Sequence, residues 1–147
     1  MKLKNNVNQL HPEVDMLKAI LLKSDIIGKS KIDVYVEELN LSAKENHIEY
    51  DFAFLINGEY YRGNEKFTIS DLYKIYNTVY SSFIEFIEKQ VLTSSKSIDI
   101  FISVCAGDKN EMSAKNILYK RIIKKLTNKY KCQYSKTDDI YVLSFTK

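Results

Sequence analysis

Residues 48–58 read IEYDFAFLING and hold the clearest strand signal in the chain. Every second residue of the run 48–56 is apolar, and two acids, Glu49 and Asp51, stand between the first of them. This alternation is typical of a half-buried β-strand. The dipeptide Asn57-Gly58 tolerates the positive φ angles of a type I′ turn, so it predicts a tight hairpin directly after the strand.

Further strands are expected on either side of this run. Residues 32–36 alternate in the same way, with isoleucine and valine on one side and polar residues on the other. After the turn, the return strand would include residues 60–62. Together the three segments predict a three-stranded antiparallel meander.

A first helix is expected upstream, over residues 12–28. Pro12 stands where the first turn of a helix tolerates proline, and Gly28 stands just past the last turn. The residues between them form a partly amphipathic segment through Leu17, Ile20, Leu21 and Leu22.

The clearest helix is expected downstream, over residues 71–90. Ser70 is a candidate N-cap, because its hydroxyl can accept a hydrogen bond from backbone N–H groups two or three residues on. Apolar residues recur at helical spacing and form one stripe: Leu72, Ile75, Tyr76, Val79, Phe83, Phe86 and Ile87. We interpret this segment as the central core helix.

The rest of the chain predicts another strand, another long helix and a hairpin. Residues 98–104 alternate, Gly107 and its neighbours break the strand, and a helix follows to near Tyr130. Residues 132–135 and 140–145 then form the final hairpin. The predicted order is α-β-β-β-α-β-α-β-β, which indicates an α+β fold with two long helices packed on a mainly antiparallel sheet.

Length and composition fit a single compact domain that spans residues 1–147, with about residues 1–9 as a flexible N-terminal tail. The hydrophobic fraction of 45% and the charged fraction of 28% are near globular averages. No apolar run is long enough to span a bilayer. The first residues lack the apolar segment of a signal peptide. We therefore expect a soluble cytoplasmic protein with no membrane partner.

Cysteine and histidine usage predicts a protein without disulfides or structural metal. Cys105 and Cys132 are the two cysteines, and we interpret both as free thiols and small core residues. With only His11 and His47 beside them, they cannot complete a zinc site of the usual Cys/His type. We expect no metal ion and no cofactor.

No residue pattern identifies a catalytic site. A nucleophilic triad needs a base held near serine or cysteine, and neither histidine has a local partner pattern. We interpret His47 as a solvated residue at a strand end. The four glycines are too scattered for a nucleotide-binding fingerprint. The acidic pairs are interpreted as solvated strand faces or a turn: Glu37-Glu38, Glu49 with Asp51, and Asp138-Asp139.

Positive charge is concentrated in the predicted second helix. Residues 109–136 hold nine basic residues and one acid, a local charge of +8 in a chain whose net charge is +3. On a helical wheel, one face of the helix 109–131 carries Lys120, Arg121, Lys124, Lys125 and Lys129. Such a face is either a nucleic-acid footprint or a solvated lysine-rich surface. The low arginine content argues against specific base recognition.

Apolar residues outside the core stripe are candidates for a protein interface. Tyr73, Tyr80 and Ile84 extend the stripe of the helix 71–90 along one edge, and Ile117 projects into the basic face of the later helix. Contact between the two helices would bury these residues. Otherwise they form an exposed patch of the kind that marks a partner site.

Three hypotheses of function follow from these patterns. The first is a non-enzymatic protein-interaction domain that binds another protein or itself, such as an assembly component of a phage or mobile element or an inhibitor of a host protein. The second is nucleic-acid binding through the basic helix 109–131. The third is an enzyme whose site is dispersed in the sequence. Lysine occurs 20 times and arginine twice, a bias typical of AT-rich genomes such as those of low-GC bacteria and their phages.

Overall fold

The structure of the chain is a computed structural model that describes residues 2–3, 14–15, 19–39, 46–60, 67–103, 114–137 and 140–146. Its strands are β1 (Lys2–Leu3), β2 (Val14–Asp15), β3 (Ala19–Ile27), β4 (Ser30–Leu39), β5 (His47–Ile56), β6 (Glu59–Tyr60), β7 (Ser97–Ser103), β8 (Gln133–Thr137) and β9 (Ile140–Phe145). Its helices are α1 (Ile69–Phe86), a π-helical turn η1 (Ile87–Val91) and α2 (Ala114–Tyr130).

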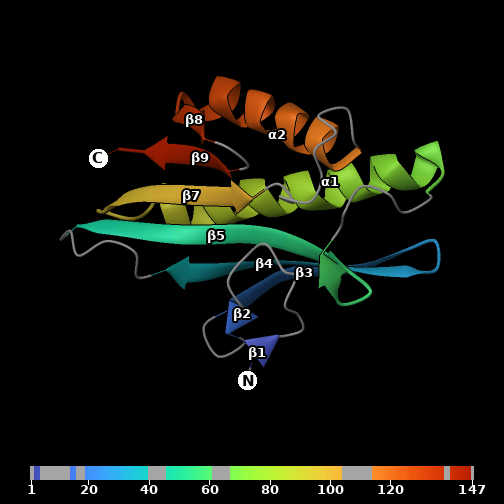
Figure 1. Cartoon of the computed structure of the whole chain (residues 1–147). Coiled ribbons are helices and arrows are strands. Elements are labelled where there is room, and N and C mark those ends of the chain that lie inside the picture. Colours follow the sequence, from blue (N-terminus) through green and yellow to red (C-terminus); the bar gives the residue numbers. More distant parts are fainter. Residues whose placement is uncertain are drawn as a thin grey trace.

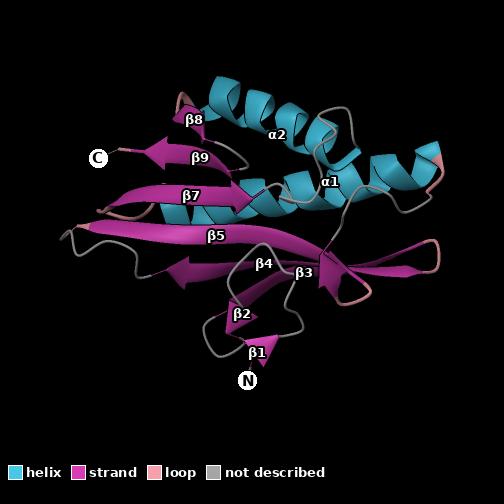
Figure 2. Cartoon of the chain, in the orientation of Figure 1, coloured by secondary structure: helices cyan, strands magenta, loops and turns pink. Residues whose placement is uncertain are grey.

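The architecture is an α+β fold with the two helices on one side of the sheet (Figures 1 and 2). The main sheet has the strand order β3-β4-β5-β7-β9-β8, and β6 pairs with β5. The strands β1 and β2 form a separate two-stranded sheet. The predicted fold class is therefore confirmed.

The sheet contains one parallel pair among its described strands. Residues 47–51 of β5 pair in parallel with residues 97–101 of β7, and the other described pairs are antiparallel. Parallel neighbours require a crossover connection, usually a helix. Here α1 and η1 supply that crossover, so α1 has to lie across one face of the sheet.

The core lies between that face and the two helices. It takes the even-numbered residues of β4, β5 and β7, the odd-numbered residues of β9, and the apolar faces of α1 and α2. At its centre the Phe52 and Phe83 rings stack with centroids 3.5 Å apart and planes 18° apart. The side chains of the stripe predicted for α1 are buried or half-buried.

The hairpin signal at Asn57-Gly58 is confirmed. Both residues have positive φ angles, 53° and 83°, as a type I′ turn requires. The Asn57 side-chain oxygen also accepts a hydrogen bond of 2.9 Å from the Lys31 amide, which ties this turn to β4. The return strand β6 is described over Glu59–Tyr60, and residues 61–62 of the predicted strand lie outside the described part of the chain.

The predicted first helix is wrong. Residues 19–27 form β3, which pairs antiparallel with β4. A register shift between Leu21 and Lys23 breaks the alternation of the strand, so its apolar residues mimic helical spacing. Gly28, with φ of 63°, forms the turn between β3 and β4 and does not end a helix. The predicted antiparallel meander is present as β4-β5-β6, and β3 adds a further antiparallel strand beside β4.

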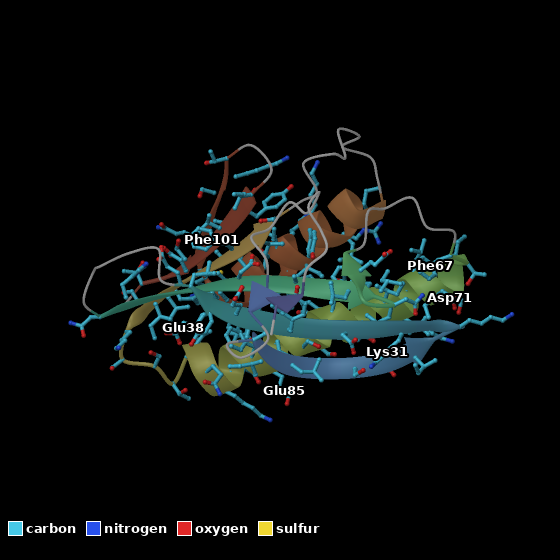
Figure 3. The ribbon with its side chains drawn as sticks, turned by 60° about the horizontal axis from the view of Figure 1, so that its bottom comes forward. Lys31, Glu38, Phe67, Asp71, Glu85 and Phe101 are labelled. Atoms are coloured by element: carbon cyan, nitrogen blue, oxygen red, sulfur yellow. The ribbon has the colours of Figure 1, made fainter. Side chains whose placement is uncertain are left out.

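The predicted N-cap of α1 is also displaced. The cap is Thr68, whose hydroxyl accepts a hydrogen bond of 3.0 Å from the Asp71 amide, and Ser70 lies within the first turn. Asp71 in turn lies close to the turn between β3 and β4. A Cβ atom added to Gly28 in that turn would be 3.3 Å from an oxygen of the Asp71 carboxylate. Figure 3 shows Asp71 at the same end of the molecule as Lys31, which lies near the start of β4.

Three predictions concern the C-terminal half of the chain. The final hairpin is confirmed as β8 and β9. The second helix is confirmed from Ala114 to Tyr130, while its expected start near Asp108 lies outside the described residues. Cys132 is a half-buried free thiol directly before β8, and Cys105 again lies outside the described part.

Replacement of Phe83 by alanine should destabilise the fold by about 3–5 kcal/mol, because it empties a fully buried aromatic site. Tyr134→Ala is the matched control, since it removes an aromatic ring that is 55% exposed and should cost about 1 kcal/mol or less. Urea unfolding of both variants measures the difference. Equal stability of the two variants would contradict the assigned core.

Candidate functional site

A groove lies between α1 and α2. Its volume is about 600 Å³, within the range of ligand-binding pockets. The wall from α1 consists of Ile69, Leu72, Tyr73 and Tyr76, and the wall from α2 consists of Ile117, Leu118, Arg121, Lys124, Lys125 and Asn128. The lining thus combines apolar side chains from both helices with three cations of α2, Arg121, Lys124 and Lys125, which we call the cationic rim.

Two side chains at the start of α1 leave large apolar surface in solvent. Ile69 is 86% exposed and Tyr73 is 66% exposed. Both stand on the groove side of α1, one turn apart. The two side chains therefore form an exposed apolar patch beside the groove.

A row of tyrosines continues from the groove along α1. The ring centroids of Tyr73 and Tyr76 are 6.4 Å apart. Those of Tyr76 and Tyr80 are 5.9 Å apart, with planes within 4° of each other. Successive turns of the helix place these rings on one edge, so a single side of α1 presents three aromatic surfaces.

Lys125 of α2 covers two of these rings. Its Nζ atom lies 5.3 Å from the Tyr76 centroid and 5.1 Å from the Tyr80 centroid, within the range of cation–π contact. A hydrogen bond to the Tyr76 side chain raises the pKa of Lys125, so this lysine stays charged. The Tyr73 ring has no described cation over it and remains open.

A second contact joins the helices at the other end. The Tyr130 hydroxyl donates a hydrogen bond of 2.8 Å to the Glu88 carboxylate. Burial is the main cause that raises the pKa of Tyr130, and the hydrogen bond to Glu88 is the second cause. The hydroxyl therefore keeps its proton. This bond links η1, which continues α1, to the end of α2, and the groove lies towards the opposite end of the helix pair.

The structure places the four predicted interface residues in different settings. Tyr73 and Ile117 line the groove. Tyr80 is half-buried against the core and is partly covered by Lys125 of α2. Ile84 is half-buried and lines a separate shallow hollow with Tyr80, Ser81 and Glu85. Contact between the helices thus accounts for part of the predicted patch, and Tyr73 remains exposed.

The five predicted basic residues share the solvent face of α2. Lys120, Arg121, Lys124, Lys125 and Lys129 are all exposed. Arg121, Lys124 and Lys125 form the rim of the groove, while Lys129 lies over the Tyr130 ring at 5.5 Å. The structure thus joins the basic face and the apolar patch, which are separate features in the sequence.

Sequence reasoning misses the importance of Ile69 and Leu72 for this surface. The apolar pattern puts Leu72 in the core stripe, and Ile69 lies before the expected N-cap. A usable signal is the spacing of Ile69 and Tyr73, two large apolar residues four apart at the start of a helix. Neither Ile69 nor Tyr73 lies in line with the buried stripe of α1.

A second cluster lies on the sheet face opposite the helices. His47 Nε2 is 3.2 Å from Asp99 Oδ2 and 3.8 Å from Glu49 Oε2. One donor atom from each of the three side chains lies within 4.8 Å of the others, an arrangement able to hold a metal ion. His47 begins β5, so it is a strand-end residue as expected, but its side chain is only 17% exposed and is less solvated than the sequence suggested.

Two further acids on this face are buried. Glu37 is 8% exposed and Asp51 is 6% exposed, and they are cross-strand partners on β4 and β5. Their interpretation as solvated strand faces is therefore wrong. Glu38, on the other side of β4, is exposed as expected.

Comparison with protein families, with curated protein sequences and with solved structures finds no match for this chain. Within the residues that the structure describes, no helix is both long and apolar enough to cross a membrane. The geometry of the groove and of the His47 cluster therefore carries the evidence for function.

Tyr73 and Tyr80 should respond differently to truncation. Tyr80→Ala should destabilise the chain by about 1–3 kcal/mol, because it removes a half-buried ring that stacks on Tyr76. Tyr73→Ala should change stability by less than about 0.5 kcal/mol, because its ring is mostly in solvent. Thermal and urea unfolding of both variants test this contrast. A larger loss for Tyr73 than for Tyr80 would show that the exposed ring is misplaced.

Proposed function

We propose that this chain is a protein-interaction domain whose α1–α2 groove receives an apolar segment of another polypeptide with acidic residues beside it. The observation that carries the proposal is the juxtaposition of exposed Ile69 and Tyr73 with the cationic rim of Arg121, Lys124 and Lys125. This mode of binding fits an inhibitor of a host protein, and it also fits an assembly component of a phage or mobile element. Proteins of both kinds act by binding another protein.

The apolar part of the groove supplies affinity. Tyrosine is enriched among the residues that dominate binding energy, particularly where it fills or flanks a desolvated pocket. An amphipathic helix can place side chains spaced three and four residues apart into such a groove. A volume of about 600 Å³ accommodates several such side chains.

The cationic rim selects the partner's charge. In a symmetric dimer formed through this groove, the same surface would meet itself. Arg121, Lys124 and Lys125 would then face their own copies, which is unfavourable for like charges. An acidic partner instead gains complementary charge, so we favour a different protein over a second copy of this chain.

A photo-crosslinking residue in place of Tyr73 tests the proposal in cells of the natural source. We expect an adduct with another polypeptide, because Tyr73 lies at the open end of the groove. The additional change Lys124→Glu should reduce the adduct several-fold, since it reverses one rim charge that attracts an acidic partner. Mass spectrometry of the adduct identifies the partner and its acidic segment.

Leu92 is the matched control position. It is a 45% exposed apolar residue that follows η1, roughly 30 Å along the helix from Tyr73 at 1.5 Å per residue. Identical adducts from positions 73 and 92, or a Tyr73 adduct that Lys124→Glu leaves unchanged, would refute the groove as the docking surface. An adduct of two copies of this chain would show that the groove mediates self-association, and it would contradict the proposed acidic partner.

Nucleic-acid binding is the second candidate, favoured by the five exposed cations of α2. Single-strand binding also uses free aromatic faces on which bases stack. Lys125 already covers Tyr76 and Tyr80, which leaves Tyr73 as the open ring of this row. The contacts therefore favour a peptide over a nucleic acid.

The salt dependence of binding distinguishes the two candidates. If nucleic acid is the partner, log affinity for an oligonucleotide should fall linearly with log salt, with a slope of about −0.7 to −0.9 per phosphate neutralised. Lys120→Glu with Lys124→Glu should reduce that slope, whereas the control Lys29→Glu with Lys96→Glu makes the same charge change away from α2. Under the protein-interaction proposal, we expect no such linear dependence and no effect specific to the α2 variant.

A further inference from the structure

We propose that His47, Glu49 and Asp99 form a binding site for a divalent first-row transition-metal ion on the sheet face opposite the helices. This site is separate from the α1–α2 groove and does not depend on the proposed partner. It combines an imidazole with two carboxylates, which are ligand types of Zn²⁺, Mn²⁺, Fe²⁺ and Co²⁺.

Strand pairing holds the three side chains in place. Glu49 on β5 and Asp99 on β7 are direct partners in the parallel register. His47 precedes Glu49 by two residues on β5, so the pleat directs both side chains to the same face. Each proposed ligand therefore comes from a paired strand, where ligand positions are held more accurately than on loops.

The separations between the donor atoms fit a shared ion. Ligands at 2.0–2.2 Å from a metal in tetrahedral or octahedral geometry lie about 3–3.6 Å from one another. His47 Nε2 lies 3.2 Å from Asp99 Oδ2 and 3.8 Å from Glu49 Oε2. The second separation lies above this range, and all three donor atoms lie within 4.8 Å of one another, so the side chains would have to move together by about 1 Å or less to share one ion.

The charge of the cluster also calls for a cation. Two carboxylates converge on one nitrogen atom, Nε2, in a setting where the three side chains are between 12% and 25% exposed. Partly buried like charges repel each other unless a cation lies between them. A divalent ion neutralises both carboxylates, while the neutral imidazole supplies a lone pair.

Three protein ligands leave the remaining coordination positions to water. Metal sites with an open position bind and activate water or a substrate oxygen, whereas sites closed by four protein ligands are structural. The partial exposure of the three side chains is consistent with an open position that faces solvent. The competing arrangement is a proton on His47, which then forms ion pairs with both acids and binds no metal.

Calorimetric titration of Zn²⁺ into the intact chain tests the site. We expect one equivalent to bind with a dissociation constant of about 10 μM or lower, and His47→Ala and Asp99→Asn each to weaken binding at least about tenfold. His11→Ala is the matched control, because it removes the chain's other histidine and should leave binding unchanged. Co²⁺ absorption should lack the thiolate band, which excludes Cys105 and Cys132 as ligands.

Three outcomes would overturn the site. One is the absence of Zn²⁺ binding by the wild-type chain up to about 1 mM. Another is binding that His47→Ala leaves unchanged or that His11→Ala abolishes. The third is a thiolate band with Co²⁺. Circular dichroism of each variant verifies folding, and Glu49→Gln supplies a shape-preserving variant that should also lose affinity.

Discussion

The parallel pairing of β5 with β7 is the constraint on which the rest of the structure depends. It requires a crossover, and α1 with η1 supplies it across one face of the sheet. Phe83 is thereby placed over Phe52 at the centre of the core, and α2 packs beside α1. On the opposite face the same register sets Asp99 beside Glu49. One backbone pairing thus positions both the groove and the His47 cluster.

Features that depend on local pattern could be predicted from the sequence. The alternation of residues 48–56 identified β5, and the requirement for positive φ at Asn57 and Gly58 identified the turn. The apolar stripe identified α1, because apolar residues that recur at helical spacing over several turns indicate an amphipathic helix. The cations of α2 were likewise found, since a surface face can be read from a wheel. In each case the pattern and the burial arise within one element.

Features that depend on pairing between distant residues could not be predicted. β3 resembled a helix because a register shift disrupts its alternation, and only its pairing with β4 shows it to be a strand. Glu49 and Asp99 are fifty residues apart, and no local signal reports that they are neighbours in a parallel register. The burial of Glu37 and Asp51 is of the same kind. Sequence patterns therefore identified the candidate cations and aromatics but not the His47 cluster.

The two ends of the helix pair differ in how far their side chains are covered. Tyr130 bonds to Glu88, and Lys125 covers Tyr76 and Tyr80, whereas Ile69 and Tyr73 at the start of α1 stay in solvent. Closing this end would require Arg121 and Lys124 to approach apolar surface and lose water, which is costly for unpaired charges. Under the proposal, an acidic partner would remove that cost by pairing with Arg121 and Lys124 while its apolar side chains cover Ile69 and Tyr73. The charges that disfavour closure of the groove would then be the ones that favour its occupation.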